Sequence, residues 1–173
     1  MAITDALEEI TAAGNYTFDL SPFTDEDGQT VHRVNRGRVF FGDSDPLPMV
    51  AILERPEESE ELTDPNPLPT ASLFNYHLVI QGFLNDNKDN PTDDAHILLA
   101  DVRRRLAIER ARKDQNQRLP DPFGLGSKRE YNRIDDFDFG AGLVRPPDEV
   151  SAKSYFWLPV KMKLIEDPLY PFN

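Results

Sequence analysis

The chain has 173 residues, 15 prolines and no cysteine, and its formal net charge is -12. The length suits one domain, and the missing cysteines exclude disulfides, thiolate metal ligands and cysteine nucleophiles. The acidic balance disfavours general nucleic-acid binding, because such binders need a basic patch that displaces counterions from phosphate.

The start of the chain predicts a short amphipathic helix. Its apolar residues recur at helical spacing and Gly14 follows as a stop signal: Ile3, Ala6, Leu7, Ile10 and Ala13. This segment carries acids and lacks the apolar core of a signal peptide, and no run reaches the ~20 apolar residues that cross a bilayer. We expect a soluble protein made in a cytoplasm, without membrane contact.

Strands are predicted over residues 31–41, with an interruption near 35–37, and over residues 49–54. A short segment rich in Gly, Asp and Pro joins them, which favours a hairpin. Residues 73–84 are apolar on both faces and predict a strand in the middle of a sheet. A short strand is predicted over residues 134–139.

The final predicted strand, residues 155–166, alternates apolar and other residues with a period of two. Pro159 lies within it and has no backbone N–H to donate to a neighbouring strand. We therefore expect this strand to lie at an edge of the sheet or to carry a bulge.

The clearest helix signal begins at Asn90, a candidate cap, and Pro91, which suits the first helical position. Acidic residues in the first turn complement the helix dipole. One apolar stripe follows, formed by Ala95, Leu98, Leu99, Val102 and Leu106.

Two isoleucines of this helix fall roughly opposite the apolar stripe, among charged residues. The predicted subunit interface on that face comprises Ile97, Asp101, Arg104, Arg105 and Ile108. Asp101 and Arg105 have the i,i+4 spacing of an ion pair. The alternative is that the isoleucines are incidental surface residues, which are common in monomers.

Two segments are predicted to be extended loops. Residues 56–69 are rich in proline and carry an acidic run: Glu57, Glu58, Glu60, Glu61 and Asp64. Residues 113–133 are polar, with two prolines and two glycines, and predict a flexible loop. Opposite charges on the acidic run and on the basic end of the long helix suit head-to-tail contacts between copies, or simply two solvated faces.

No pattern in the sequence indicates an enzyme, a cofactor or a metal site. His32, His77 and His96 are far apart and lack a metal-ligand spacing. Residues 85–96 resemble a calcium loop only superficially, because the required Gly is Asn90 and the final Glu is His96. There is also no G-x-S-x-G nucleophile motif.

The order of elements predicts one α+β domain over residues 1–173, with a mainly antiparallel sheet of about four to five strands. An N-terminal helix and one long helix are expected to pack against that sheet. The loops at 56–69 and 113–133 extend from it.

Three segments together resemble the tail terminator proteins of long-tailed bacteriophages, the lambda-type family. They are residues 33–56, 76–107 and 155–166, about two thirds of the chain. The first segment joins a basic strand to an acidic turn and a second strand. Its family-like residues are Arg36, Gly37, Arg38, Gly42, Pro46 and Pro48.

The resemblance implies a structural virion protein without catalysis, assembled in the bacterial cytoplasm and located in the tail neck. Such proteins form a ring, typically a hexamer, that caps the tail tube, ends its polymerisation and joins a head-side connector protein. DNA passes through the lumen without specific binding, and an acidic bore would not retain it. Two alternatives remain open: another neck component such as a head-completion adaptor, and a small metal-dependent hydrolase.

Overall fold

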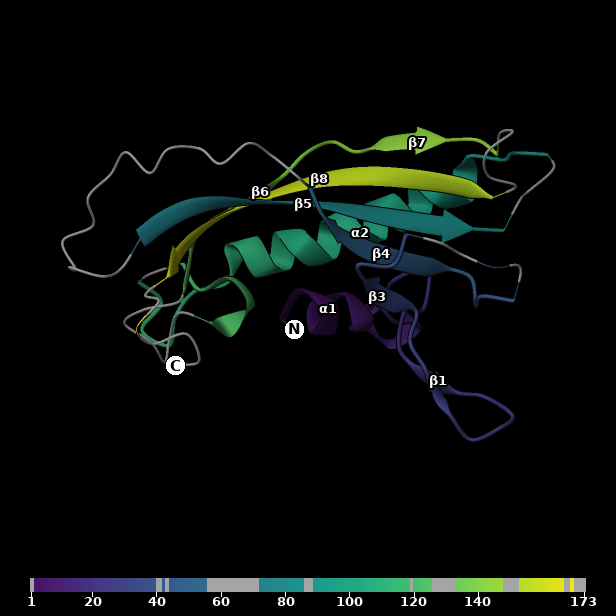
Figure 1. The fold of residues 1–173 in the computed structure, drawn as a ribbon, viewed down its shortest axis with the longest axis horizontal. Coiled ribbons are helices and arrows are strands. Elements are labelled where there is room, and N and C mark those ends of the chain that lie inside the picture. Colours follow the sequence, from purple (N-terminus) through teal and green to yellow (C-terminus); the bar gives the residue numbers. More distant parts are fainter. Residues whose placement is uncertain are drawn as a thin grey trace.

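The computed structural model describes residues 2–39, 42, 44–55, 72–85, 89–118, 120–125, 133–147, 153–166 and 169. A six-stranded mixed sheet forms one layer, in the order β3-β4-β5-β8-β6, with β7 also paired to β8. Two helices pack on one face of it, and α2 lies behind β5 and β8 in Figure 1. The chain is therefore an α+β protein, as predicted.

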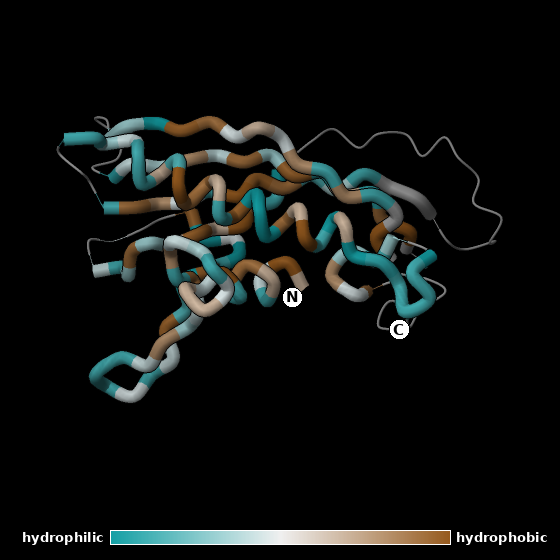
Figure 2. Tube along the Cα trace, turned by 180° about the vertical axis from the view of Figure 1, so that it is seen from behind, coloured by the Kyte–Doolittle hydropathy of each residue, from teal (hydrophilic) through white to brown (hydrophobic). Residues whose placement is uncertain are grey.

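The elements have the following bounds. The helices are α1 (Ala2–Glu8) and α2 (Asp93–Ala111), with short 3-10 turns η1 (Ala12–Gly14) and η2 (Pro122–Gly124). The strands of the large sheet are β3 (Val34–Arg36), β4 (Met49–Glu54), β5 (Ser72–Leu84), β6 (Arg133–Phe139), β7 (Leu143–Arg145) and β8 (Ser154–Glu166). A separate two-stranded excursion pairs β1 (Phe23–Thr24) with β2 (Thr30–Val31), and its tip is hydrophilic (Figure 2).

The two longest strands, β5 and β8, form the centre of the sheet. They pair antiparallel along all of their described length, from Ser72 opposite Glu166 to Leu84 opposite Ser154. Alternate residues point toward the helices, and these form the core with the apolar stripe of α2. Gly82 lies directly opposite Phe156, whose ring occupies the space where a Cβ would stand, 2.1 Å from the nearest ring atom.

The predicted hairpin between the first two strands is wrong, because β3 and β4 are parallel, with Val34 opposite Val50. A parallel pair needs a connection of about a dozen residues or more that carries the chain back to its starting end. Residues 37–48 provide this connection. It begins at Gly37, whose positive φ of 66° reverses the chain where other residues would be strained.

Of the two expectations for β8, the edge position is wrong, since β8 lies between β5 on one side and β6 and β7 on the other. The pairing of β8 does carry a register shift, but on β6 between Ile134 and Asp136, away from Pro159. Pro159 is tolerated because its carbonyl accepts from the Gly140 N–H (2.9 Å) in the gap between β6 and β7. In an antiparallel ladder the N and O of one residue face the same neighbour, so the missing donor also falls in that gap.

The strands over 73–84 and 134–139 are confirmed, and so is the buried stripe of the long helix. Two boundaries differ. The first helix ends at Glu8, and the N-cap position of α2 is Thr92 rather than Asn90, without a capping hydrogen bond from the Thr92 side chain. Part of the expected loop at 113–133 is ordered and buried, because η2 places Phe123 in the core.

Candidate assembly surfaces

Figure 2 shows α2 from the side that faces away from the sheet, and on this side the helix carries a strip of exposed residues with two isoleucines. Ile97 is 40% exposed and Ile108 is 47% exposed. We call this strip the helix surface; it comprises Ile97, Ala100, Arg104 and Ile108, which share one side of the helix. The Arg104 guanidinium lies 4.7 Å from the Tyr16 ring centroid and donates to the Asn15 carbonyl (2.7 Å), so its position is held by the chain itself.

Two residues of the predicted interface are not available to a partner, because Asp101 and Arg105 are buried. Asp101 accepts hydrogen bonds from the backbone N–H groups of Thr17 (2.9 Å) and Phe18 (3.1 Å). It therefore anchors the segment that follows η1. Asp101 and Arg105 therefore do not form a solvated ion pair, despite their i,i+4 spacing. Asp101 contacts the backbone of residues 17–18, and Arg105 contacts α1.

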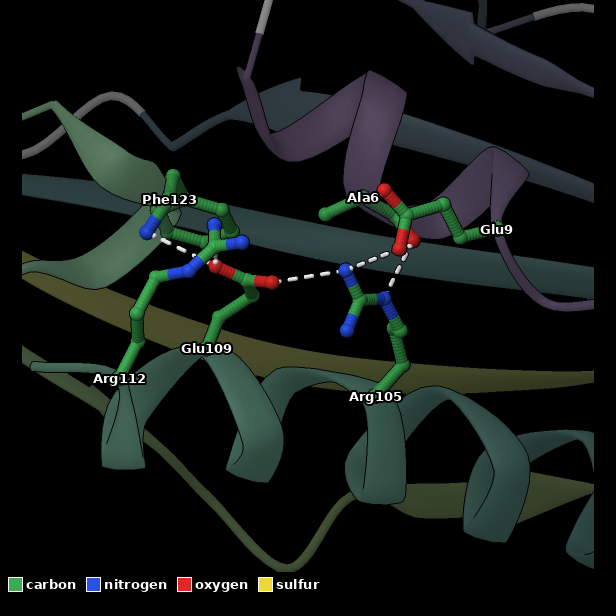
Figure 3. A network of polar contacts seen from close by, with 6 residues as sticks. All are labelled: Ala6, Glu9, Arg105, Glu109, Arg112 and Phe123. Atoms are coloured by element: carbon green, nitrogen blue, oxygen red, sulfur yellow. Dashed lines mark hydrogen bonds and ion pairs between the residues drawn. The ribbon is translucent and has the colours of Figure 1, made fainter. Parts of the chain in front are cut away.

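Arg105 belongs to a buried polar network around Glu109, which is 1% exposed (Figure 3). The Arg105 guanidinium donates to Glu109 Oε1 (2.7 Å), to Glu9 and to the Ala6 carbonyl. Glu109 Oε2 accepts from Arg112 (2.9 Å) and from the Phe123 N–H (2.9 Å). The network joins α1, α2 and η2, so its role is to hold the fold.

A second exposed apolar surface lies on the opposite side of the sheet from α2. Trp157 (40% exposed) and Leu143 (48% exposed) stand directly opposite each other on β8 and β7. The ring of Tyr155 lies 5.6 Å from that of Trp157 and 6.2 Å from that of Phe83, centroid to centroid. We call these four residues the aromatic surface.

The aromatic surface was missed from the sequence, although the signal was present. Trp157 and Tyr155 stand on the odd positions of the last strand, opposite its buried even positions. A strand with large apolar groups on both parities is typical of a strand covered on both faces. Among the described residues, helices cover only one face of this sheet, so the aromatic groups remain at the surface.

Charges are distributed unevenly on this outer face. At the end of β8 beyond Pro159, Lys161 is opposite Asp138 and Lys163 is opposite Asp136, so positive and negative residues are matched across strands. At the aromatic end, the exposed Arg145 is opposite Tyr155. Lys153, next to β8, donates to the Gly42 carbonyl (3.2 Å). Arg145 and Lys153 thus lie at the same end of the sheet as the aromatic surface.

The family-like residues form a closed turn and one wall of a cleft. Arg38 donates to Asp45 (2.6 Å), which also accepts from the Gly42 N–H (2.7 Å), while the Pro48 carbonyl accepts from Arg33 (3.2 Å). Burial opposes ionisation of Asp45, but these hydrogen bonds from Gly42 and Arg38 outweigh it and hold the pKa of Asp45 below its usual value. The acidic turn is therefore structural, and Pro46 lies within it.

Arg36 lines a cleft of about 630 Å³ at the β3–β4 side of the sheet, together with Glu54 and Tyr76. Ile52 and Leu78 also line the cleft. Burial, with a hydrogen bond to Glu54, raises the pKa of Tyr76 to about 12, while Arg36 acts in the opposite direction. Tyr76 thus lies close to one acidic and one basic side chain, Glu54 and Arg36.

The remaining predicted groups do not converge. His32 contacts Glu8 (2.7 Å), His77 lies in β5, and His96 is exposed on α2. Within the described ranges, no three His, Asp or Glu side chains are grouped so that they could hold a metal ion. The acidic run from Glu57 to Asp64 lies outside the described residues.

No helix in the described part of the chain is long and apolar enough to cross a membrane. In comparisons with known proteins, the chain matches no family model and no curated protein.

Proposed function

We propose that this chain is a structural subunit that assembles with copies of itself into a closed ring, and that the ring caps a phage tail tube. The observation that carries the proposal is the pair of exposed apolar surfaces on opposite sides of one thin α/β layer. The helix surface contains Ile97 and Ile108, and the aromatic surface contains Trp157 and Leu143.

Exposed surfaces on opposite sides of a subunit suit heterologous contacts, in which each surface of one copy meets a different part of the next copy. Such contacts produce a ring when the rotation between copies closes. Exposed apolar groups on an otherwise acidic and polar chain are typical of surfaces that are covered in an assembly. The resemblance to tail terminators and the acidic charge favour a ring that serves as a conduit, which DNA traverses without being retained.

Within this proposal, the ring binds the tail tube protein on one side and a head-side connector protein on the other. It would be a hexamer located in the neck of the virion, and it would act by binding alone. The helix surface contributes to the subunit contact through Ile97, Arg104 and Ile108, while Asp101 and Arg105 keep that surface in place.

The test is electron microscopy and light-scattering mass of the purified chain. The wild-type protein should form rings with an open centre, and Ile97→Asp with Ile108→Asp should abolish them. The matched control, His96→Asp with Ala107→Asp, changes the two preceding exposed positions, about 100° around the helix. The control should still form rings.

A second assay separates the tail terminator from a head-completion adaptor. Added rings should stop polymerisation of tail tube protein at substoichiometric amounts and should bind the assembled tube. Binding to the portal protein instead, without any effect on the tube, would assign the chain to the adaptors. A wild-type chain that stays monomeric at all concentrations would contradict the ring.

A further inference from the structure

The segment that follows β8 combines two features that fit the aromatic surface. It reads Asp167-Pro168-Leu169-Tyr170-Pro171-Phe172, the only place in the chain where two prolines are three residues apart. Proline fixes φ and favours the extended polyproline II helix, in which a P-x-x-P segment presents its prolines along one side. Such segments bind aromatic-lined surfaces at low entropic cost, because their conformation is already set.

The apolar character of this segment is already visible at its one described residue. Leu169 is 66% exposed, which makes it the most exposed large hydrophobic residue in the described part of the chain. Tyr170 and Phe172 add two more apolar groups in sequence. A run with this composition needs a surface to cover it.

The aromatic surface has matching properties. Phe83 and Tyr155 are neighbours across β5 and β8, Tyr155 and Trp157 are neighbours along β8, and Leu143 stands opposite Trp157 on β7. Arg145 stands opposite Tyr155 on β7, on the other side of β8 from Phe83. The acidic residues that precede the first proline of the segment, Glu166 and Asp167, provide a charge complementary to Arg145.

The segment cannot reach the aromatic surface of its own chain. Trp157 lies nine residues before Glu166 in the same strand, a separation of about 30 Å at the rise of a β-strand. Even Phe172, six residues beyond Glu166, has its Cα at most about 22 Å from that of Glu166, which is short of this separation. Because the aromatic surface is near the start of β8 and the segment is at its end, the contact requires a second copy.

We infer that residues 167–172 of one copy bind, as an extended P-x-x-P segment, to the aromatic surface of a neighbouring copy. Leu169 and Phe172 cover Trp157 and Leu143, and Asp167 faces Arg145. Each copy gives one segment and receives one, which is a heterologous contact that can continue around a ring. This inference rests on the proposed self-assembly and identifies one contact that produces it.

The first test uses Trp157 as its reporter, because it is the only tryptophan of the chain. A peptide of residues 166–173 is titrated into protein that carries Leu169→Asp and Phe172→Asp, so that the protein's own segments do not compete with the peptide. Saturable change of the tryptophan fluorescence is expected. The same two substitutions in the peptide, or Leu143→Asp in the protein, should weaken binding at least about tenfold, the effect of losing one strong interface residue.

The second test uses full-length variants and sizing. The L169D/F172D variant and the L143D variant should each fail to form rings. An equimolar mixture should give a one-to-one pair and no ring, because one intact segment meets one intact surface. Adding Ile97→Asp to the L169D/F172D protein should leave its binding of the peptide unchanged, since the helix surface is separate from the aromatic surface.

Three outcomes distinguish a failure of this inference from a failure of the proposed ring. If L169D/F172D forms rings as the wild type does, the inference is wrong and the ring proposal stands. If the peptide binds while the wild-type chain never forms rings, the ring proposal fails and the contact between segment and surface stands. If oligo(dT) alters Trp157 fluorescence and the peptide does not, the aromatic surface is a nucleic-acid site and the inference is overturned.

Discussion

Both faces of the sheet carry large apolar and charged residues, but these are buried on one face and exposed on the other. On the helix-covered face, Phe156 and Phe137 are buried and even charged groups are enclosed, as in the network of Arg105 and Glu109. On the outer face, Trp157 and Leu143 remain exposed, and the charges are matched across strands in solvent. Stability therefore resides mainly on the helix side, which leaves the outer face free to bind without affecting folding.

Because the buried charges lie on the helix-covered face, we expect Glu109→Ala to have the largest effect on stability. The substitution leaves the buried Arg105 without Glu109 and removes the acceptor of the Phe123 N–H. Breaking one partner of a buried charge pair costs about 3–5 kcal/mol of the free energy of unfolding. Urea denaturation followed by far-UV circular dichroism measures this. Arg110→Ala removes an exposed ion pair on the same helix and should cost less than about 1 kcal/mol.

Gly82→Ala is expected to have the next largest effect. The added Cβ would stand 2.1 Å from the Phe156 ring, inside van der Waals contact, so the ring or the strand must shift. Overpacking of this kind costs about 1–3 kcal/mol. Thermal or urea unfolding should show the loss, and the double variant with Phe156→Leu should recover part of it. An unchanged midpoint for Gly82→Ala would mean that the two strands pack less tightly here.

A pH-dependent loss of stability should follow from Tyr76. Its folded pKa of about 12 exceeds the ordinary value of 10.0, so the unfolded chain loses this proton first as the pH rises. The contribution of Tyr76 is complete below pH 10 and decreases between pH 10 and 12. Its size is on the order of 1 kcal/mol after discounting for partial exposure. Urea midpoints measured across that range should decline less steeply in Tyr76→Phe; identical slopes would refute the assignment.

The smallest effect on stability is expected on the outer face. Leu143→Ser removes an exposed side chain from the aromatic surface and should change the free energy of unfolding by less than about 0.5 kcal/mol. Denaturation of diluted protein measures this term separately from assembly. A loss similar to that of Gly82→Ala would show that the outer face contributes to the core, and the contrast between the two faces would not hold.

The spacing of apolar residues within a segment was sufficient to predict some of the helices and strands. The apolar stripe from Ala95 to Leu106 and the strands over 73–84 and 134–139 follow from spacing alone. These predictions succeeded because the side chains of one face must be buried together, whatever they pack against.

Tertiary structure decided the direction of β3 relative to β4, the interior position of β8 and the burial of Asp101 and Arg105. The first depends on how residues 37–48 connect the two strands. The other two depend on partners distant in sequence: Gly140 opposite Pro159, and the backbone of α1 and of residues 17–18. Spacing within a segment reports which residues share a face. It does not report which face another segment will cover, because that depends on the packing of the whole chain.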